Sequence, residues 1–440
     1  MLSNLLERSY VERSKRFTML LALAILATVS LQSAESQNIS RWIATDGGWG
    51  DPNNWDNTVP LGSFTAVLES QTGEVKLDFQ SIDLNTLVLD SPTINLVLDN
   101  FIFAGFLDWQ QGQISGDSEF RLFVDGQIID ATLETTFNNR AFVRLGSEGV
   151  FGRIDCTTSA VWNNLCGSVL EVVDGSQFGN FTNNGQGQLN IENSLLSLNG
   201  PSSSINWDVT NEGTIEINNS VVLFLKDYEQ SLDAELILNN ATADFFNATT
   251  FRGKISGTGA VRNLDGSGVE SELVPGGTAI GSIEFAGGLI MTEETECSFQ
   301  IAPNLTSDTV TNIGGPLQLD GTLNIEALFG ATTGIYTLFT YDNDFMLQTD
   351  GLEFGKVPAG FEGLLFHDPV EQAVKLDVRQ LTPAVLLGDI NGDGNIDLLD
   401  VAGFVNLLSS GEFQLEADIN QDGLVNLLDV AMFVELLAGG

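Results

Sequence analysis

A short pattern of alternating apolar and polar residues recurs at close intervals along the chain. Two copies, Gly187-Gln-Leu-Asn-Ile-Glu-Asn-Ser-Leu-Leu and Gly213-Thr-Ile-Glu-Ile-Asn-Asn-Ser-Val-Val, agree at most positions. A third, Leu236-Ile-Leu-Asn-Asn-Ala, repeats the part of the second copy that begins at Ile215. One copy cannot bury its own apolar side chains, so successive copies must stack, and the pattern predicts a parallel β-solenoid. We expect asparagines at equivalent turns of its coils: Asn193, Asn219 and Asn240.

The repeats and their limits predict a mostly β protein with a small α-helical domain at its C-terminus. Beyond residue 252 the β character continues but the repeat is lost, and Pro383 interrupts the last strand pattern. We expect five segments: a signal peptide (1–36), a β-solenoid with a Trp-rich N-terminal cap (37–252), a solenoid end or small β-sandwich (253–380), a linker (381–388) and a metal-binding module (389–440).

The N-terminus has the pattern of an export signal. Four basic residues between Arg8 and Arg16 precede an apolar run from Met19 to Val29, which is too short to span a bilayer, and small residues follow at Ala34 and Ser36. We expect cleavage and no membrane insertion afterwards; the alternative is an uncleaved, anchored form. The protein would then be secreted or held at the cell surface.

The charge balance excludes two classes of partner. The chain has 59 acidic and 17 basic residues, so it repels nucleic acid phosphates and anionic membrane surfaces. The acidity suits solubility and the binding of divalent cations.

Three cysteines suit an oxidising compartment, in which Cys156 and Cys166 are close enough in sequence to form a disulfide bridge. The alternative is that these two and Cys297 are buried apolar residues. A zinc site is not expected, because three scattered cysteines and the single His367 offer too few ligands.

Three tryptophans, Trp42, Trp49 and Trp55, stand close together in the sequence among Gly, Asn and Asp. This composition predicts a packed cap at the start of the solenoid. The alternative is a sugar-binding surface, on which exposed rings stack against pyranoses.

The C-terminal segment contains two copies of a loop with oxygen-bearing side chains at positions 1, 3, 5, 9 and 12 and glycine at position 6. This is the spacing of calcium loops, in which alternate side chains point inward and position 7 supplies a carbonyl oxygen. The two copies begin at Asp389 and Asp418. The predicted ligands of two Ca²⁺ ions are Asp389, Asn391, Asp393, Asn395, Asp397 and Asp400 in the first loop, and Asp418, Asn420, Asp422, Leu424, Asn426 and Asp429 in the second.

Each loop leads into an amphipathic helix, expected at 398–408 and 427–437, and no helix is expected before the first loop. This arrangement resembles the type I dockerin module, which also accepts Asp at loop position 12. The resemblance implies calcium binding and docking to a protein partner, either cohesin-like or at the cell surface. However, Leu398-Leu399 and Leu427-Leu428 occupy positions where cellulosomal dockerins usually have small hydroxyl residues. These leucines would either pack the two helices together or contact an apolar patch on another partner.

Three passages resemble the passenger regions of autotransporter-like β-helix proteins, a resemblance that spans residues 42–345. They are Trp49-Gly-Asp-Pro-Asn-Asn-Trp, Gly253-Lys-Ile-Ser-Gly-Thr-Gly-Ala-Val and Leu273-Val-Pro-Gly-Gly-Thr-Ala-Ile-Gly-Ser-Ile. This resemblance implies a secreted bacterial protein whose β-helix displays or binds a ligand, with polysaccharide as one candidate.

No catalytic residue is predicted. Nucleophile–histidine pairs would all require His367, and no nucleophile elbow or helical zinc motif is present. The sequence favours a non-catalytic, calcium-binding scaffold protein. The alternative is a dockerin-bearing polysaccharide lyase or glycoside hydrolase, for which Arg140, Arg144 and Arg153 are candidate bases.

Overall fold

The computed structural model describes most of the chain between residues 38 and 439. The predicted signal peptide and a Cys156–Cys166 bridge lie outside the described residues, while Cys166 itself is exposed and Cys297 is buried. Within this span the following positions are not described: 70–71, 78–79, 148–151, 156–158, 174–175, 179–185, 201, 248, 343–347, 381–385 and 421.

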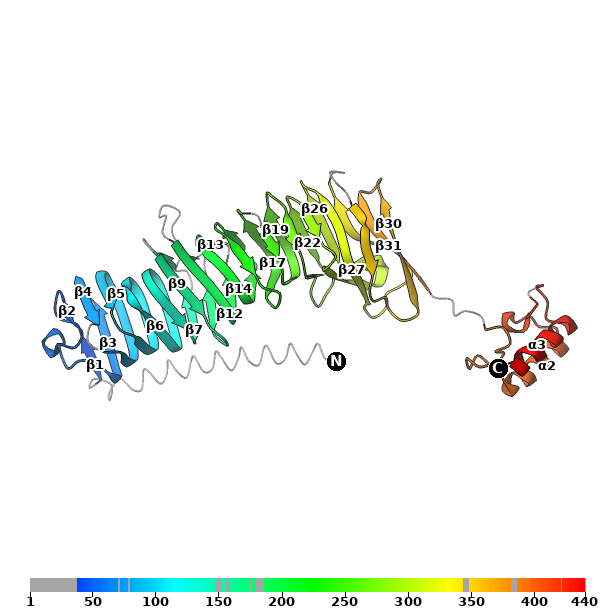
Figure 1. The fold of residues 1–440 in the computed structure, drawn as a ribbon, viewed down its shortest axis with the longest axis horizontal. Helices are drawn as coiled ribbons and strands as arrows, with labels where there is room; N and C mark the ends of the chain where they lie inside the picture. Colours follow the sequence, from blue (N-terminus) through cyan, green and yellow to red (C-terminus); the bar gives the residue numbers. More distant parts are fainter. Residues whose placement is uncertain are drawn as a thin grey trace. The chain divides into compact units, whose positions relative to one another are not determined.

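The chain divides into two compact units. One contains residues up to 357 together with 364–377, and the other contains 358–363 together with 378–440. Strands dominate the first unit, and the α-helices of the described residues lie in the second (Figure 1). The protein is therefore mostly β with a small helical region at its C-terminus, as the sequence predicts. None of the helices in the described residues is long and apolar enough to cross a membrane.

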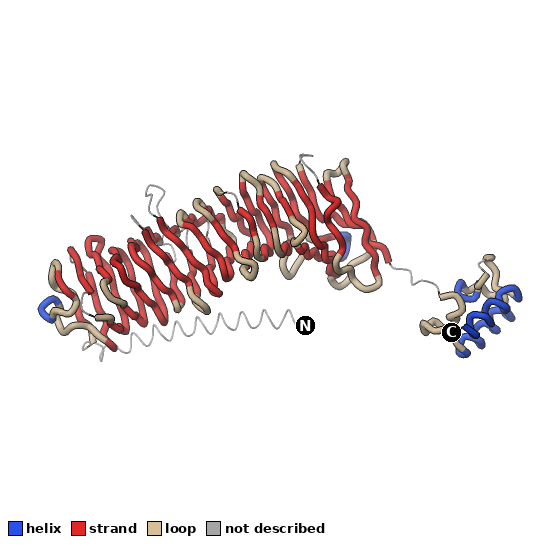
Figure 2. Tube along the Cα trace, viewed as in Figure 1, coloured by secondary structure: helices blue, strands red, loops and turns tan. Residues whose placement is uncertain are grey.

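The N-terminal half of the first unit consists of strands that lie side by side in successive layers (Figure 2). Each is hydrogen-bonded in parallel to a strand one layer further along. Ile39 lies opposite Thr65, and Val169 lies opposite Leu195. The strands of this half are β1 (Ile39–Arg41), β2 (Gly47–Gly48), β3 (Gly62–Glu69), β4 (Gly73–Leu77), β5 (Ile82–Leu98), β6 (Ile102–Asn139), β7 (Phe142–Leu145), β8 (Arg153–Asp155), β9 (Ser159–Asn164), β10 (Val169–Val172), β11 (Gln177–Phe178), β12 (Gln186–Asn199) and β13 (Ser202–Ile205).

The parallel pairing continues through most of the later strands with layers of varying length, and the pairing of Ile301 with Ser307 is antiparallel. Ile215 lies opposite Leu236, which in turn lies opposite Ile255. The remaining strands are β14 (Asp208–Asn218), β15 (Val221–Phe224), β16 (Tyr228–Gln230), β17 (Glu235–Phe245), β18 (Thr249–Phe251), β19 (Lys254–Asn263), β20 (Ser267–Val269), β21 (Glu272–Pro275), β22 (Ser282–Ala286), β23 (Leu289–Met291), β24 (Glu296–Ala302), β25 (Thr306–Ser307), β26 (Thr309–Ile313), β27 (Leu317–Ala327), β28 (Gly334–Tyr341), β29 (Gln348–Phe354), β30 (Phe361–Asp368) and β31 (Ala373–Gln380).

The core of the first unit is filled by alternate side chains of these strands. Ile215 and Ile217 of β14 are fully buried, because successive side chains of a strand point to opposite faces. Aromatic rings stack from layer to layer with centroid separations between 4.1 and 6.3 Å. In order along the stack these rings are Phe120, Phe137, Trp162, Phe178 and Trp207.

The predicted register between the two clearest sequence copies is wrong. The copies would place Ile191 beside Ile217, but β12 and β14 instead place Leu198 opposite Ile217. On either side of an irregularity between Glu192 and Leu195, Leu189 lies opposite Val209 and Leu198 opposite Ile217, so a layer here takes fewer residues than the spacing between the copies. The two similar sequence segments thus occupy different sides of neighbouring layers.

Two of the three predicted asparagine turns are confirmed. Asn219 and Asn240 have φ values of 49° and 53°, and the side-chain amide of Asn240 donates a 3.2 Å hydrogen bond to the side-chain oxygen of Asn219. Asparagine tolerates this left-handed conformation better than most residues. The placement of Asn193 at the same turn is wrong, since Asn199 pairs with Asn218 and Gly200, at φ 108°, follows it.

The three N-terminal tryptophans form a buried cluster beside the short 3₁₀ helix η2 (Pro52–Asn54). Trp55 packs edge-on against Trp42 and Trp49, with ring centroids 5.2 and 4.7 Å away. Its indole N–H donates a 2.8 Å hydrogen bond to the Trp49 carbonyl. Because all three rings are buried, the alternative of a sugar-stacking surface at these tryptophans is wrong.

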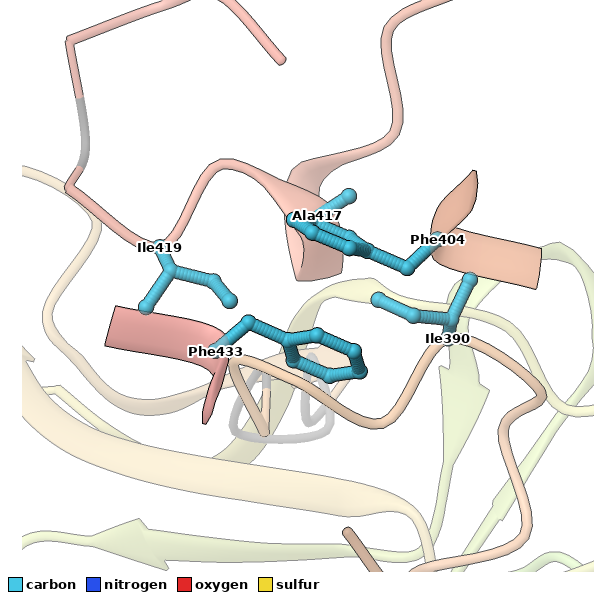
Figure 3. Packing of buried hydrophobic residues seen from close by; sticks show 5 residues of the cluster. All are labelled: Ile390, Phe404, Ala417, Ile419 and Phe433. Atoms are coloured by element: carbon cyan, nitrogen blue, oxygen red, sulfur yellow. The ribbon is translucent and has the colours of Figure 1, made fainter. Parts of the chain in front are cut away.

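The second unit contains two α-helices, α2 (Leu398–Ser410) and α3 (Leu427–Gly439), with the 3₁₀ turn η4 (Leu415–Ala417) between them. Both helices begin where predicted and run slightly further than expected, to Ser410 and Gly439. The rings of Phe404 and Phe433 lie 4.2 Å apart at the centre of the helical region. Ile390, Ala417 and Ile419 complete this small buried cluster (Figure 3).

Candidate metal-binding loops

Asp389, at position 1, closes the first loop by accepting backbone N–H groups from its turn. Its Oδ1 accepts from Gly392 N at 2.8 Å and Asp393 N at 3.1 Å, and its Oδ2 accepts from Gly394 N at 2.8 Å. Gly394, at position 6, has a φ of 85°, a conformation that side-chain-bearing residues rarely adopt. These hydrogen bonds and the left-handed turn at Gly394 fold residues 389–394 around the carboxylate of Asp389.

Asp400, at position 12, joins the two ends of the same loop from the first turn of α2. Its Oδ1 accepts from Asn391 N at 3.0 Å and its Oδ2 from Asp397 N at 2.9 Å. Asp397 in turn caps the helix by accepting from Leu399 N at 2.7 Å. This reciprocal capping arrangement fixes where α2 starts and brings position 9 close to position 12.

The second loop repeats these bonds at equivalent positions. Asp418 accepts from Asp422 N at 3.0 Å and Gly423 N at 2.8 Å, and Gly423 has a φ of 86°. Asp429 accepts from Asn420 N at 3.0 Å and from Asn426 N at 2.8 Å. Two segments of different sequence thus fold into the same loop because the same spacing of Asp, Asn and Gly is present in both.

The end positions of both loops place carboxylates in the protein interior. Asp400 and Asp429 are fully buried, and Asp389 and Asp418 are 7% and 2% exposed. Residues 386–440 contain ten acidic residues and no Lys, Arg or His to pair with them. Burying an ionised carboxylate without a cation is costly even when backbone N–H groups solvate it, so the donor set calls for a positive ion.

The chemistry of the donors fits a hard divalent cation. Position 3 of the first loop, Asn391, donates its side-chain amide to Asp393 Oδ2 at 3.0 Å, and this bond holds the pKa of Asp393 below its usual value. Asn395 N also donates to Asp393, at 2.9 Å. In the described residues no group of three or more His, Cys, Asp or Glu side chains is arranged so that these side chains alone could hold a metal ion. Oxygen donors of these mixed kinds suit Ca²⁺ better than zinc.

The structure links most of the predicted ligands of each loop to one another, directly or through shared backbone groups. In the second loop Asn420 donates its side-chain amide to Asp422 Oδ2 at 3.0 Å, and Leu424 N donates to Asp422 Oδ1 at 3.0 Å. Leu424 thus matches Asn395 at position 7 of the first loop. Ile396 and its equivalent Val425 pack against the buried cluster of the module.

The paired leucines at positions 10 and 11 point to solvent. Leu398 and Leu399 are 82% and 68% exposed, and Leu427 and Leu428 are 81% and 67% exposed. The alternative in which they pack the two helices together is wrong, since Phe404 and Phe433 make that contact. Four large apolar side chains are therefore displayed at equivalent places on the two loops.

The candidate bases for a polysaccharide lyase lie on the outer surface of the strand unit. Arg144 Nε is 2.7 Å from Glu171, and Arg153 Nη2 is 2.8 Å from Asp130; each pair joins neighbouring layers. Arg140 is exposed. The hydroxyl of Tyr341 lies 2.5 Å from His367 Nε2. The two ion pairs give Arg144 and Arg153 a structural role between neighbouring layers.

One surface feature was not predicted from the sequence. Phenylalanines at 101, 103, 106, 123 and 142 point outward from neighbouring layers around β6 and β7, where the expected pattern would place polar residues. In this part of the sequence, apolar residues occupy both odd and even positions. Which of them face outward can be decided only when the register of the strands is known.

The segment that holds both loops and both α-helices matches a known protein family. For the chain as a whole, no curated protein and no solved structure matches, so the resemblance of residues 42–345 to autotransporter passengers gains no support. The family match agrees with the hydrogen bonding of the two loops and with the helix that follows each of them. Residues 387–437 match the family model of the dockerin type I domain.

Proposed function

We propose that this chain is an exported scaffold protein whose C-terminal module binds two Ca²⁺ ions and docks onto a protein partner. The strand unit would be a parallel β-solenoid, whose coils are the observed layers, and it would display or bind a ligand of its own. The observation that carries the proposal is the pair of loops with matching hydrogen bonds and buried carboxylates at both ends.

Each ion would be held by the side chains at positions 1, 3, 5, 9 and 12 and by the carbonyl of position 7. Bound calcium neutralises the buried carboxylates and fixes the start of the helix that follows, because position 12 lies in its first turn. The full sets are Asp389, Asn391, Asp393, Asn395, Asp397 and Asp400 for one ion, and Asp418, Asn420, Asp422, Leu424, Asn426 and Asp429 for the other.

A place outside the cell suits this module. Sites of this class work at the calcium concentrations found outside cells, and residues 1–36 have the pattern of an export signal. The protein would be secreted or attached to the cell surface through its partner.

Docking would use the exposed leucines. Dockerin type I domains bind cohesins, and in this module Leu398-Leu399 and Leu427-Leu428 are exposed, large apolar side chains at equivalent positions of the two loops. Water contact with such side chains is unfavourable, and burying one contributes about 1.5–3 kcal/mol. A cohesin-like partner of this chain should therefore present an apolar pocket in place of groups that bind hydroxyls.

Replacing all four leucines by serine should abolish docking while leaving the calcium loops intact, because these side chains contribute nothing to the buried cluster. The C-terminal segment 381–440 would be used to capture partners from the envelope fraction of the producing cells, with calcium present. Capture should fall by about tenfold or more relative to the parent segment.

Phe413→Ser is the matched control, since Phe413 is an exposed apolar residue of the same module outside both loops. Capture that is lost in chelator but retained by the four-serine variant would show that another surface docks. Equal capture by the parent segment with and without calcium would contradict the proposed function itself.

A further inference from the structure

The outer side of β6 and β7 displays an unusual group of rings, here called the aromatic face: Phe101, Phe103, Phe106, Phe123 and Phe142. Phe103 and Phe123 stack with their centroids 6.1 Å apart, and Phe101 lies 6.4 Å from Phe103. An exposed apolar group of this extent on an acidic, otherwise polar surface is typical of a binding site.

Part of the aromatic face is already covered by a cation. The guanidinium of Arg121 lies 4.9 Å from the ring centroid of Phe101 and 5.3 Å from that of Phe103. The side chains of Phe106 and Phe123 remain 42% and 46% exposed. The aromatic face is therefore open around Phe106 and Phe123.

A cleft of about 330 Å³ begins at Phe106. This volume is within the range of roughly 300–1,000 Å³ that is usual for small-ligand pockets. Its walls combine aromatic rings with planar polar side chains. Among the residues that line it are Phe106, Phe142, Asp108, Asp125, Gln127 and Arg144. Asp125 lies opposite Phe142 in the register of β6 and β7.

The charges of the cleft select against anions. Burial raises the pKa of Asp125, and the N–H of Gly126 and the charge of Arg144 offset this only in part. Arg144 is paired with Glu171 at 2.7 Å, and Asp108 accepts the amide of Gln110 at 2.5 Å. The cleft therefore contains the carboxylates of Asp108 and Asp125, while the guanidinium of Arg144 is neutralised by Glu171. Such an acidic site repels uronates and sulfated glycans.

We propose that this cleft binds one sugar unit of an uncharged polysaccharide. The Phe106 ring would pack against the apolar face of the pyranose, while Asp108, Asp125 and Gln127 would accept and donate hydrogen bonds at its hydroxyl groups. A ligand that is apolar on one face and carries hydroxyl groups at its edge can pack against the rings and form hydrogen bonds with the polar side chains at the same time. A protein surface fits less well, because it would leave the cleft's carboxylates buried against apolar atoms.

The test is affinity electrophoresis of the full chain in native gels that contain galactomannan, a neutral β-glucan or polygalacturonate. The proposal expects retardation by at least one of the two neutral polymers and none by polygalacturonate. Phe106→Ala should weaken the retarding interaction about tenfold, since an aromatic contact is lost. Asp125→Asn, which keeps the size of the side chain but exchanges an acceptor for a donor, should weaken it as well.

Phe329→Ala is the matched control, because Phe329 is fully exposed and lies outside the aromatic face. Phe106 is itself exposed, so its truncation leaves no cavity, and circular dichroism would verify that the variants remain folded. The proposal is overturned if neither neutral polymer retards the parent chain, or if Phe106→Ala and Phe329→Ala migrate alike. Retardation by polygalacturonate alone, or capture of a protein through Phe106, would overturn it too.

Discussion

The segment 381–440 should be largely unfolded in chelator and become helical when calcium is added. Without an ion, Asp400 and Asp429 would have to be buried as charges, next to other carboxylates and with no basic residue between 386 and 440 to compensate. The buried cluster around Phe404 and Phe433 is small, and domains of this size commonly need a metal or a disulfide bridge to fold. Binding energy therefore becomes folding energy.

Far-ultraviolet circular dichroism of this segment during a calcium titration measures the effect. The midpoint should fall at or below ~10⁻⁴–10⁻³ M, the weak end of such sites. Asp389→Ala should disable the first loop and Asp418→Ala the second, since each carboxylate accepts the backbone N–H groups that shape its loop. Glu412→Ala, an exposed acid between the loops, is the control. A helical spectrum that chelator leaves unchanged would contradict calcium-driven folding.

Ile217→Asp should unfold the strand unit. Ile217 is fully buried in β14, between Leu198 in one neighbouring layer and Leu238 in the other. An aspartate there loses the packing of both contacts and must either stay ionised in an apolar interior or take up a proton. The destabilisation should exceed about 4 kcal/mol, which is at the far end of single-substitution effects.

Urea unfolding followed by circular dichroism would compare this variant with Val221→Asp. Val221 is a β-branched strand residue on the outer side of β15, 38% exposed, so the same change there should cost little. Equal unfolding midpoints for the two variants would contradict the burial of Ile217 in the core that stabilises the strand unit.

The shape of the two candidate loops could be predicted from the sequence because their geometry is local, whereas their calcium ligands remain a prediction. The spacing of Asp, Asn and Gly determines which side chains come together. Position 1 and position 12 belong to one short loop, and position 12 lies in the first turn of the helix that follows. Asp397 and Asp400 show this directly, as both the cap of α2 and the closure of the loop depend on this one pair of neighbouring carboxylates.

The register of the strands could not be predicted, because it depends on how many residues each corner takes. The step along the chain from Ile39 to its partner Thr65 is longer than the step from Ile215 to Leu236, and the next step, to Ile255, is shorter again. The number of residues per layer is therefore not constant, and the sequence contains no fixed repeat length from which the register could be predicted. Shifting a strand by one residue exchanges its two faces, and for this reason the outward position of the aromatic face was not foreseen.

The tryptophan cluster has a consequence for self-association. A terminal strand in a stack normally offers unpaired N–H and C=O groups to which the strand of another molecule can add. Here the segment around Trp55 runs antiparallel beside the first strand: Ile43 N donates to Asn54 O and Asp56 N donates to Arg41 O, both at 2.9 Å. The chain thus occupies part of its own edge at this end, between Arg41 and Ile43, and leaves fewer backbone groups to which a second copy could add.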